Sequence, residues 1–311
     1  MLATFLIVLP IFALVLAGWI ARRSGVLGVN ATTELNRFVV YLALPALLFD
    51  ITSHAHWTDL WQPGFIAVFG ISTLLIFAIT VVVRMRGRRH LADAAIDGLN
   101  AGYANTAYMG FPIALSLLGH QALAPTTIAS IITVCVVFAI AIILIEVGLQ
   151  TDARALAVAG KVGRSLIRNP LLVAPALGAL VPIAGADAPP AAESFLKMLG
   201  GAASPCALVA LGLFLAEKSE DEKGLTASAA QLVTLKLVLH PVLAWLLASA
   251  VFHLTPAMTR TVVLLAALPT GTGPFMLAEF YAREAAVTSR VILISTIISI
   301  VTVSAYIAFS A

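Results

Sequence analysis

Two short segments contain the residues best suited to bind a small solute. Each combines proline, which removes a backbone donor and cannot continue a helix, with glycine, which tolerates unwound backbone. Such segments leave peptide N–H and C=O groups without helical partners, and these groups can hydrogen-bond a ligand. The candidate binding residues are Asn105, Tyr108, Gly110 and Pro112 in the first segment and Pro269, Thr270, Gly271, Thr272, Gly273 and Pro274 in the second.

The chemistry that these segments offer is anion binding by neutral groups. A helix that restarts after Pro112 or Pro274 presents free N–H groups and partial positive charge at its first turn, and a carboxylate suits that field. Asn105 and Tyr108 add side-chain hydrogen bonds, and the two threonines of the second segment are similar candidates. The alternative for each polar side chain is that it only satisfies the freed backbone groups.

Lys236 is a further candidate, because it lies deep inside an apolar stretch rather than in a loop. Two interpretations stay open. The lysine balances an anionic substrate or a nearby carboxylate, or its long side chain reaches the cytoplasmic surface. His240 follows one turn later and precedes Pro241, and we interpret it as a histidine at a local kink rather than as a proton relay.

The elements that position these residues are membrane spans. Hydrophobic residues make up 61% of the 311-residue sequence and charged residues 11%, with a mean hydropathy of +1.04, which excludes a soluble domain of this length. Stretches long enough to cross about 30 Å of hydrocarbon recur along the whole chain. The ten expected spans are 3–22, 35–53, 63–83, 94–118, 126–148, 168–184, 192–216, 227–252, 258–281 and 287–310, of which the fourth and ninth contain the breaks.

Basic residues mark one side of the membrane. Arginine and lysine gather where spans one, three, five, seven and nine end, whereas the opposite loops at 54–62, 119–124, 182–192 and 253–256 contain neither. Because cytoplasmic loops hold the basic excess, we expect both termini outside, on the periplasmic face of a bacterial inner membrane. The net charge of +3 then requires no nucleic-acid partner, since anionic membrane lipids suffice.

The chain divides into two halves. Residues 1–149 hold five spans, 150–167 form a cytoplasmic link, and 168–311 hold five more. An odd number of spans per half makes the second copy enter the membrane from the opposite side, which predicts an inverted repeat. Internal similarity favours this division: Glu34, Arg37, Pro45, Ala46 and Leu47 correspond to Glu193, Lys197, Pro205, Cys206 and Ala207.

The break sequences resemble those of the auxin efflux carrier family, and most closely its bacterial branch of malonate- and malate-type permeases. The runs from Asn100 to Pro112, from Leu268 to Pro274 and from Tyr41 to Leu48 carry this resemblance. It implies an all-α fold of ten transmembrane helices, similar to sodium/proton antiporters and bile-acid transporters, in which helices four and nine are unwound and cross. It also implies elevator movement, with helices 1, 2, 6 and 7 as a scaffold and homodimer surface and helices 3–5 and 8–10 as the transport part.

Small residues inside the expected spans are assigned structural roles. Cys135 and Cys206 are expected to be free thiols, because neither is placed to meet an oxidising compartment. Five glycines are expected to let helices approach closely. They are Gly18, Gly178, Gly200, Gly201 and Gly212.

Taken with the resemblance, these patterns favour a secondary transporter of small organic anions, that is, mono- or dicarboxylates such as malonate, malate or auxin-like weak acids. A cation or proton antiporter of the same fold and a non-transporting solute sensor are the alternatives; the break segments lack the carboxylates that an ion exchanger needs. Zinc-protease, nucleophile-elbow and phosphate-loop motifs are absent from the sequence, so an enzyme has no support. No cofactor or metal is expected, and proton or sodium coupling is left open.

Overall fold

The described part of the computed structural model comprises residues 2–54, 60–150, 155–185, 189–216 and 222–310. Every regular element in these residues is a helix, apart from one isolated β-bridge. Six segments are long and apolar enough to cross a membrane. They are Ala31–Ser53, Pro63–Arg86, His120–Gly148, Pro190–Leu215, Thr226–Val251 and Ala285–Ala308. The prediction of a helical chain with several membrane-length segments is confirmed for the part of the chain that the structure describes.

The first half of the chain combines two uninterrupted helices, two segments with an internal π-helical turn and one broken segment. A π-helical turn is a local widening that is frequent near functional sites. The elements are α1 (Leu2–Arg23), α2 (Ala31–Phe38), η1 (Val39–Ala43), α3 (Leu44–Ser53), α5 (Pro63–Arg86), α6 (Leu91–Gly102), η2 (Thr106–Gly110), α7 (Phe111–Leu118), η3 (His120–Ala122), α8 (Leu123–Ile131), η4 (Ile132–Val137) and α9 (Phe138–Gly148).

The second half begins with α10, an amphipathic helix of the kind that lies at a membrane surface, and contains the second broken segment. Its elements are α10 (Ala155–Arg168), α11 (Pro170–Ile183), α12 (Pro190–Gly201), α13 (Ala203–Leu215), α14 (Glu222–Thr234), η5 (Leu235–Leu239), α15 (His240–Leu246), η6 (Leu247–Val251), α16 (Pro256–Ala266), α17 (Gly273–Phe280) and α18 (Ala285–Ser310).

The four remaining expected spans also match helices, one of them short and two of them divided. Span 3–22 corresponds to α1, and span 168–184 to the 14-residue helix α11. Spans 94–118 and 258–281 are each divided into two helices. Proline stands in the first turn of both α7 and α17, where its missing N–H costs no helical hydrogen bond. The prediction of two broken segments is therefore confirmed.

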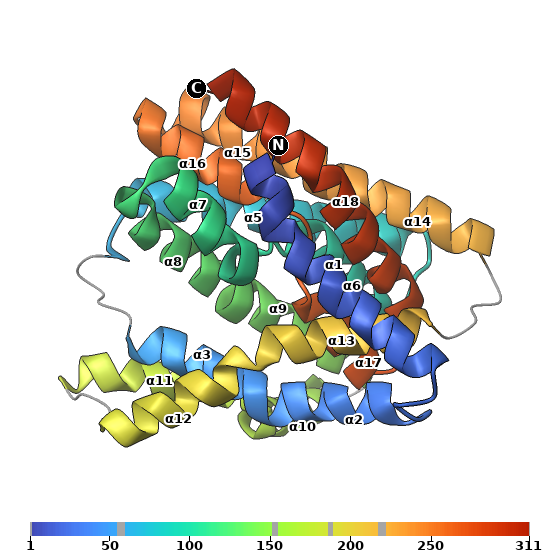
Figure 1. Ribbon diagram of the computed structural model, residues 1–311. Helices are drawn as coiled ribbons and strands as arrows, with labels where there is room; N and C mark the ends of the chain where they lie inside the picture. Colours follow the sequence, from blue (N-terminus) through green and yellow to red (C-terminus); the bar gives the residue numbers. More distant parts are fainter. Residues whose placement is uncertain (1, 55–59, 151–154, 186–188, 217–221, 311) are drawn as a thin grey trace.

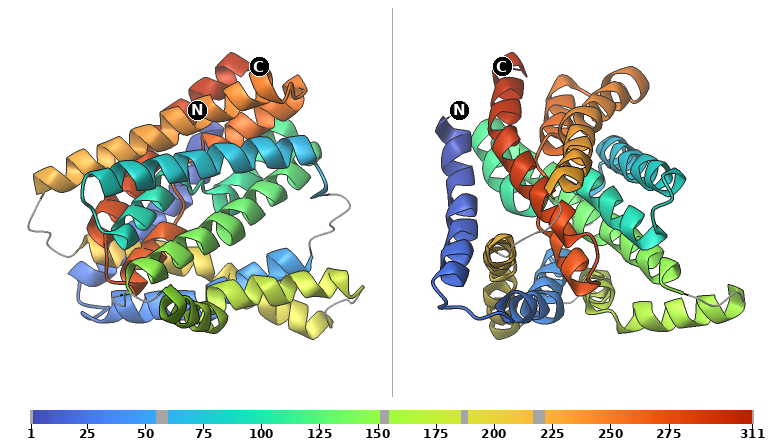
Figure 2. Two further views of the ribbon diagram at one scale, coloured as in Figure 1. Left: turned by 180° about the vertical axis from the view of Figure 1, so that it is seen from behind. Right: turned by 90° about the vertical axis from the view of Figure 1, so that its right-hand side faces the viewer.

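The helices form two groups; in Figure 1, α2, α3 and α11–α13 lie below the second group, and α1 runs from beside α13 up across the front of the molecule. The first group contains α1–α3 and α11–α13, in which α3 packs on α11 and α12 while α13 packs on α1 and α2. The second group contains α5–α9 and α14–α18, in which α6 packs on α5 and α9 and α14 packs on α18. The view from behind in Figure 2 shows the same two layers, with α10 in the lower one, and α10 packs on both α9 and α11.

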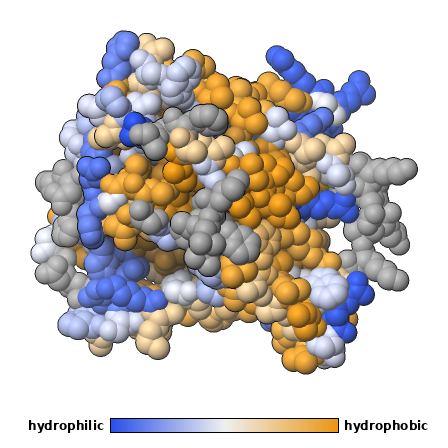
Figure 3. All heavy atoms as spheres, turned by 45° about the horizontal axis from the view of Figure 1, so that its top comes forward, coloured by the Kyte–Doolittle hydropathy of each residue, from blue (hydrophilic) through white to orange (hydrophobic). Residues whose placement is uncertain are grey.

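Apolar side chains cover the middle of the face drawn in Figure 3, and hydrophilic residues gather toward its left and right edges. Ion pairs join the connections at one end of the molecule. Arg283 donates to Asp93 at 2.5 and 2.9 Å, which raises the pKa of the guanidinium, and Arg89 donates to Glu284 at 2.5 Å. The α5–α6 and α17–α18 connections thus lie side by side. Arg154 and Lys218, which belong to the basic pattern of the sequence, lie outside the described residues.

Two glycines bring α1 and α13 into backbone contact. A Cβ atom on Gly18 would lie 2.2 Å from the carbonyl oxygen of Val209, and one on Gly212 would lie 2.0 Å from that of Val15. Distances below 3.0 Å require the backbones to move apart. The prediction of close helix approach is confirmed for both residues.

The other three predicted glycines belong to α11 and α12, the two helices that pack on α3. Cβ atoms on Gly178 and Gly200 would lie 2.2 Å from Thr52 Oγ1 and 2.9 Å from the Leu47 backbone, so these glycines also permit close packing. For Gly201 the prediction is wrong. No atom lies within 4 Å of its Cβ position, because this glycine faces a cavity rather than a helix.

We expect Gly18→Ala and Gly212→Ala to destabilise the protein by about 1–3 kcal/mol each, because the added methyl group overpacks the α1–α13 contact. Thermal unfolding in detergent measures this as a lower Tm. Gly160→Ala is the matched control, since Gly160 is helical and has no atom within 4 Å of its Cβ position. Equal Tm values for the three variants would contradict the role of the contact.

Candidate functional site

The two broken segments pair with each other. Ala104 and Thr270 form the isolated antiparallel bridge. On one side of it the Asn105 N–H donates to the Pro269 carbonyl oxygen at 2.8 Å, and on the other the Gly271 N–H donates to the Tyr103 carbonyl oxygen at 3.1 Å. Backbone groups that leave one helix at its break are therefore satisfied by the other break, as apolar surroundings require.

The helices that end at the crossing also receive donors at their last carbonyl groups. The buried Thr270 hydroxyl donates to the Asn100 carbonyl oxygen at 2.8 Å, near the end of α6. The Lys236 ammonium donates to the Ala266 carbonyl oxygen at 2.6 Å, at the end of α16. A cation at a helix C-terminus also opposes the negative end of the helix dipole.

Lys236 is fully buried, so its side chain does not reach the surface. Its ammonium lies 3.1 Å from Nδ1 of His240, whose Nε2 lies 3.2 Å from the Thr73 hydroxyl. The histidine thus has a partner on each side and follows the π-helical turn η5. Lys236 supports the end of α16 and does not line the cavity described next.

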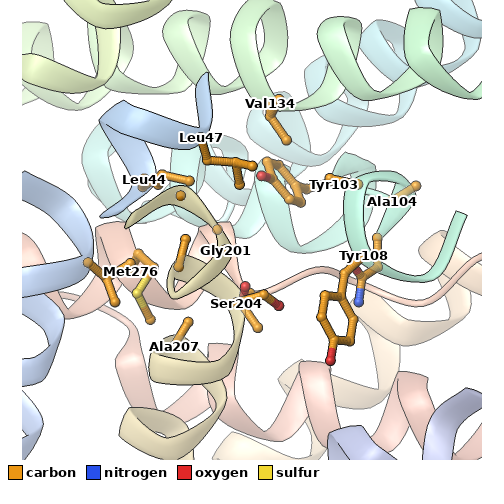
Figure 4. Close-up of a pocket in the computed structure, with 17 residues that line it drawn as sticks. Leu44, Leu47, Tyr103, Ala104, Tyr108, Val134, Gly201, Ser204, Ala207 and Met276 are labelled. Carbon is orange, nitrogen blue, oxygen red and sulfur yellow. The ribbon is translucent and has the colours of Figure 1, made fainter. Parts of the chain in front are cut away.

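A cavity of about 270 Å³ lies between the two groups of helices, beside the crossing. Figure 4 shows Tyr103 and Tyr108 of the first broken segment, with Leu44 and Leu47 of α3 and with Gly201 and Ser204 of α12 and α13 around the same space. Thr272 and Gly273 at the start of α17 complete it. The polar side chains of the lining are Tyr103, Asn105, Tyr108, Ser204 and Thr272.

The electrostatic character of this cavity comes from neutral groups, since its 17 lining residues include no acidic or basic side chain. The start of η2 contributes Ala107 and Tyr108, and the start of α17 contributes Gly273. Residues from the first turns of two helical segments therefore line one space, together with hydroxyl and amide side chains. This arrangement can hold an anion without a buried countercharge.

The structure brings four of the predicted site residues to the cavity: Asn105, Tyr108, Thr272 and Gly273. The remaining seven lie around the crossing without lining the cavity. They are Gly110, Pro112, Pro269, Thr270, Gly271, Pro274 and Lys236.

Several of these residues shape the crossing instead. Cβ atoms on Gly271 and Gly273 would lie 2.9 and 2.6 Å from the Tyr103 ring, so both glycines make room for that ring against the second break. Gly110 packs near the Thr126 methyl group, at 3.3 Å from its own Cβ position. The glycines therefore serve ring and helix packing as well as backbone freedom.

Sequence reasoning did not select Tyr103, Gly201, Ser204 or Met276 as site residues, yet all four line the cavity. Tyr103 could have been selected from the sequence, because it is an aromatic residue directly before the predicted unwound backbone. Gly201 and Ser204 lie far along the chain from both breaks, more than 60 residues from the second and more than 80 from the first, and only the packing of α12 and α13 brings them to the cavity.

The fold and the site define a multi-pass membrane transporter rather than an enzyme, because apolar segments enclose a solute-sized cavity at paired helix breaks. The chain belongs to the membrane transport protein family, which matches residues 4–307. This is the auxin efflux carrier family that the break sequences resemble.

Three relatives cover most of the chain. A Rhizobium meliloti protein named "Putative malonate transporter" is 32% identical over 299 residues, which are 96% of this chain and 93% of that protein. The Escherichia coli K12 "Uncharacterized transporter YfdV" is 26% identical over 290 residues, 87% of this chain and 86% of its own. An "Uncharacterized transporter" of Methanothermobacter thermautotrophicus is 26% identical over 296 residues, 94% of each chain.

Side chains added at Gly201 should fill the cavity without disturbing the fold, because no atom lies within 4 Å of its Cβ position. We expect Gly201→Leu to weaken solute binding about tenfold or more, Gly201→Ala to do so less, and Tm to change by no more than about 3 °C. Solute-dependent Tm shifts measure binding, and Gly160→Leu controls for an added side chain elsewhere. Undiminished binding by Gly201→Leu would remove this cavity from the solute site.

Proposed function

We propose that the protein is a secondary transporter of small organic anions, that is, mono- or dicarboxylates such as malonate, malate or auxin-like weak acids. The observation that carries this proposal is the cavity where two helix starts and five neutral polar side chains meet. A carboxylate gains most from such a set of donors, because backbone N–H groups and hydroxyls supply hydrogen bonds and the helix dipoles supply partial positive charge.

The cavity size favours a substrate of a few carbon atoms. Its volume of about 270 Å³ lies just below the range in which drug-sized ligands bind. The resemblance to the Rhizobium protein named for malonate supports the same class. The described lining contains no acidic residue, which gives a cation or proton antiporter less support. A solute sensor differs from a transporter in that it binds the solute without counterflow.

The proposed architecture is ten transmembrane helices in two inverted repeats. The antiparallel pairing of the two breaks supports it, since inverted copies approach each other from opposite sides. So do two corresponding ion pairs: Glu34 with Arg37 in α2, and Glu193 with Lys197 in α12. These are residues whose sequence similarity first indicated the repeat.

The proposed mechanism is elevator movement of the second group of helices against the first. The cavity between the groups supports it, because sliding of one wall would carry a bound solute across. Among the described residues, the contacts across the junction include the hydrogen bond from Asn36 of α2 to the Met276 carbonyl oxygen at 3.3 Å and two aromatic pairs, Tyr41 with Phe280 and Phe214 with Phe275.

The protein is further proposed to lie in the bacterial inner membrane with both termini outside, in contact with membrane lipids. Exposed apolar residues on the first group, among them Leu177, Phe195 and Met198, suit lipid and a second copy equally, so the homodimer stays a prediction. Proton or sodium coupling is tested by carboxylate uptake in proteoliposomes on which proton and sodium gradients are imposed separately.

We expect saturable counterflow of labelled malonate or a related carboxylate in proteoliposomes that contain the protein. Asn105→Ala should raise the KM about five- to thirtyfold, because one amide hydrogen bond to a charged ligand is lost. Asn30→Ala, in an exposed turn, is the control. Cation exchange without carboxylate counterflow would favour the antiporter, and binding without counterflow would favour the sensor.

A cross-link between the two groups should stop transport if one must slide past the other. The Tyr41 and Phe280 rings lie 5.7 Å apart across the junction. In a variant without Cys135 and Cys206, we expect a short bifunctional thiol reagent to abolish counterflow of Tyr41→Cys/Phe280→Cys, with either single cysteine remaining active.

The matched control for the cross-link places both cysteines on one helix of the first group. Glu193→Cys/Lys197→Cys spans one turn of α12, so its cross-link restrains no movement between groups. Full counterflow by the cross-linked Tyr41/Phe280 pair would contradict the elevator mechanism while leaving carboxylate transport intact.

A further inference from the structure

A second hollow, of about 400 Å³, lies at the same junction between the two groups of helices. Amphipathic α10 forms one side of it, and α10 packs against both α9 and α11. We call this hollow the arginine cleft. Its principal lining residues are Tyr41, Glu146, Arg164, Arg168, Asn169 and Phe280.

The charge of the arginine cleft is net positive. Arg164 and Arg168 are four residues apart on α10, so they lie on one face of the helix, and both are exposed. Neither has an acidic partner among the described residues. The acidic residue of the lining is Glu146, whose carboxylate accepts a hydrogen bond from the Tyr281 hydroxyl at 2.8 Å.

This unpaired state sets the two arginines apart from others at the same end of the molecule. Arg84, Arg89 and Arg283 each pair with a carboxylate at 2.5–2.9 Å. Two guanidinium groups facing a hollow without a carboxylate partner form a receptor for an anion from solution.

The cleft and the central cavity share two walls. η1 contributes Val39 to the cavity and Tyr41 to the cleft, while α17 contributes Gly273 to the cavity and its last residue, Phe280, to the cleft. Phe280 stands seven positions after Gly273 on this helix, which is roughly 10 Å along the axis. Within the cleft lining, the Tyr41 and Phe280 rings contact each other edge to face at 5.7 Å.

We propose that the arginine cleft is the cytoplasmic docking site for the transported dicarboxylate. Each guanidinium matches a carboxylate group with two parallel hydrogen bonds, and two guanidiniums one helical turn apart suit a short molecule with a carboxylate at each end. The cleft concentrates anions at the mouth of the path, whereas the uncharged central cavity binds the solute during transfer. This inference rests on the proposed function.

The test compares charge removal inside and outside the cleft. Counterflow of labelled malonate is measured in inside-out membrane vesicles, which expose α10 under the proposed topology, for Arg164→Gln/Arg168→Gln. We expect a KM about five- to twentyfold higher with little change in the maximal rate, because steering and docking precede transfer. Arg164→Lys/Arg168→Lys should restore part of the loss, since the charge remains without the bidentate geometry.

Two further variants sharpen the result. Arg86→Gln/Arg88→Gln removes the same charge from exposed positions near the end of α5, outside the cleft, and should leave the KM unchanged. Glu146→Gln removes the negative charge of the cleft and should lower the KM. A monocarboxylate of equal length should respond less than malonate to loss of the arginines, because it engages one guanidinium instead of two.

Three outcomes overturn the inference. Equal KM values for the Arg164/Arg168 and Arg86/Arg88 variants would show that the effect is surface charge alone. A difference that vanishes when the purified protein is reconstituted in uncharged lipid would assign the cleft to the phosphate group of an anionic lipid. Absence of carboxylate counterflow by the unsubstituted protein would overturn the proposed function as well, whereas the first two outcomes leave that function standing.

Discussion

Backbone groups that a broken helix leaves unpaired are costly in hydrocarbon, and the whole site follows from how this chain satisfies them. The breaks meet at Ala104 and Thr270, where each strand-like stretch supplies the hydrogen bonds that the other lacks. The helix ends beside the crossing take side-chain donors from elsewhere, the Thr270 hydroxyl for α6 and the Lys236 ammonium for α16. Residues at the starts of η2 and α17 line the cavity beside this crossing, and the proposed function assigns their first-turn donors to a solute.

The charge distribution supports the proposed transfer of an anion. The described lining of the central cavity is neutral, so a carboxylate bound there as proposed would not meet a fixed cation that holds it too tightly to leave. The ammonium group of the buried Lys236 donates a hydrogen bond to the Ala266 carbonyl oxygen and does not line the cavity. Unpaired arginines lie at the mouth of the junction, where water screens their attraction and allows release.

The contacts within the first group of helices differ in kind from the contacts across the junction between the two groups. Within the first group, glycines allow backbone contact, as between α1 and α13, and such packing resists separation. Across the junction the described residues make aromatic edge contacts and one amide hydrogen bond at 3.3 Å. The proposed movement of one group as a unit requires that contacts within each group outlast those across the junction.

The sequence by itself determined the membrane class, most span positions and both breaks, because hydropathy, proline and glycine act locally in the chain. It also selected Asn105, Tyr108, Thr272 and Gly273 of the cavity lining. Only the tertiary structure decided that Thr270 and Lys236 serve backbone carbonyls and that Gly201 faces a cavity. Such roles depend on the rotation and register of helices distant in sequence, which periodicity in one span does not specify.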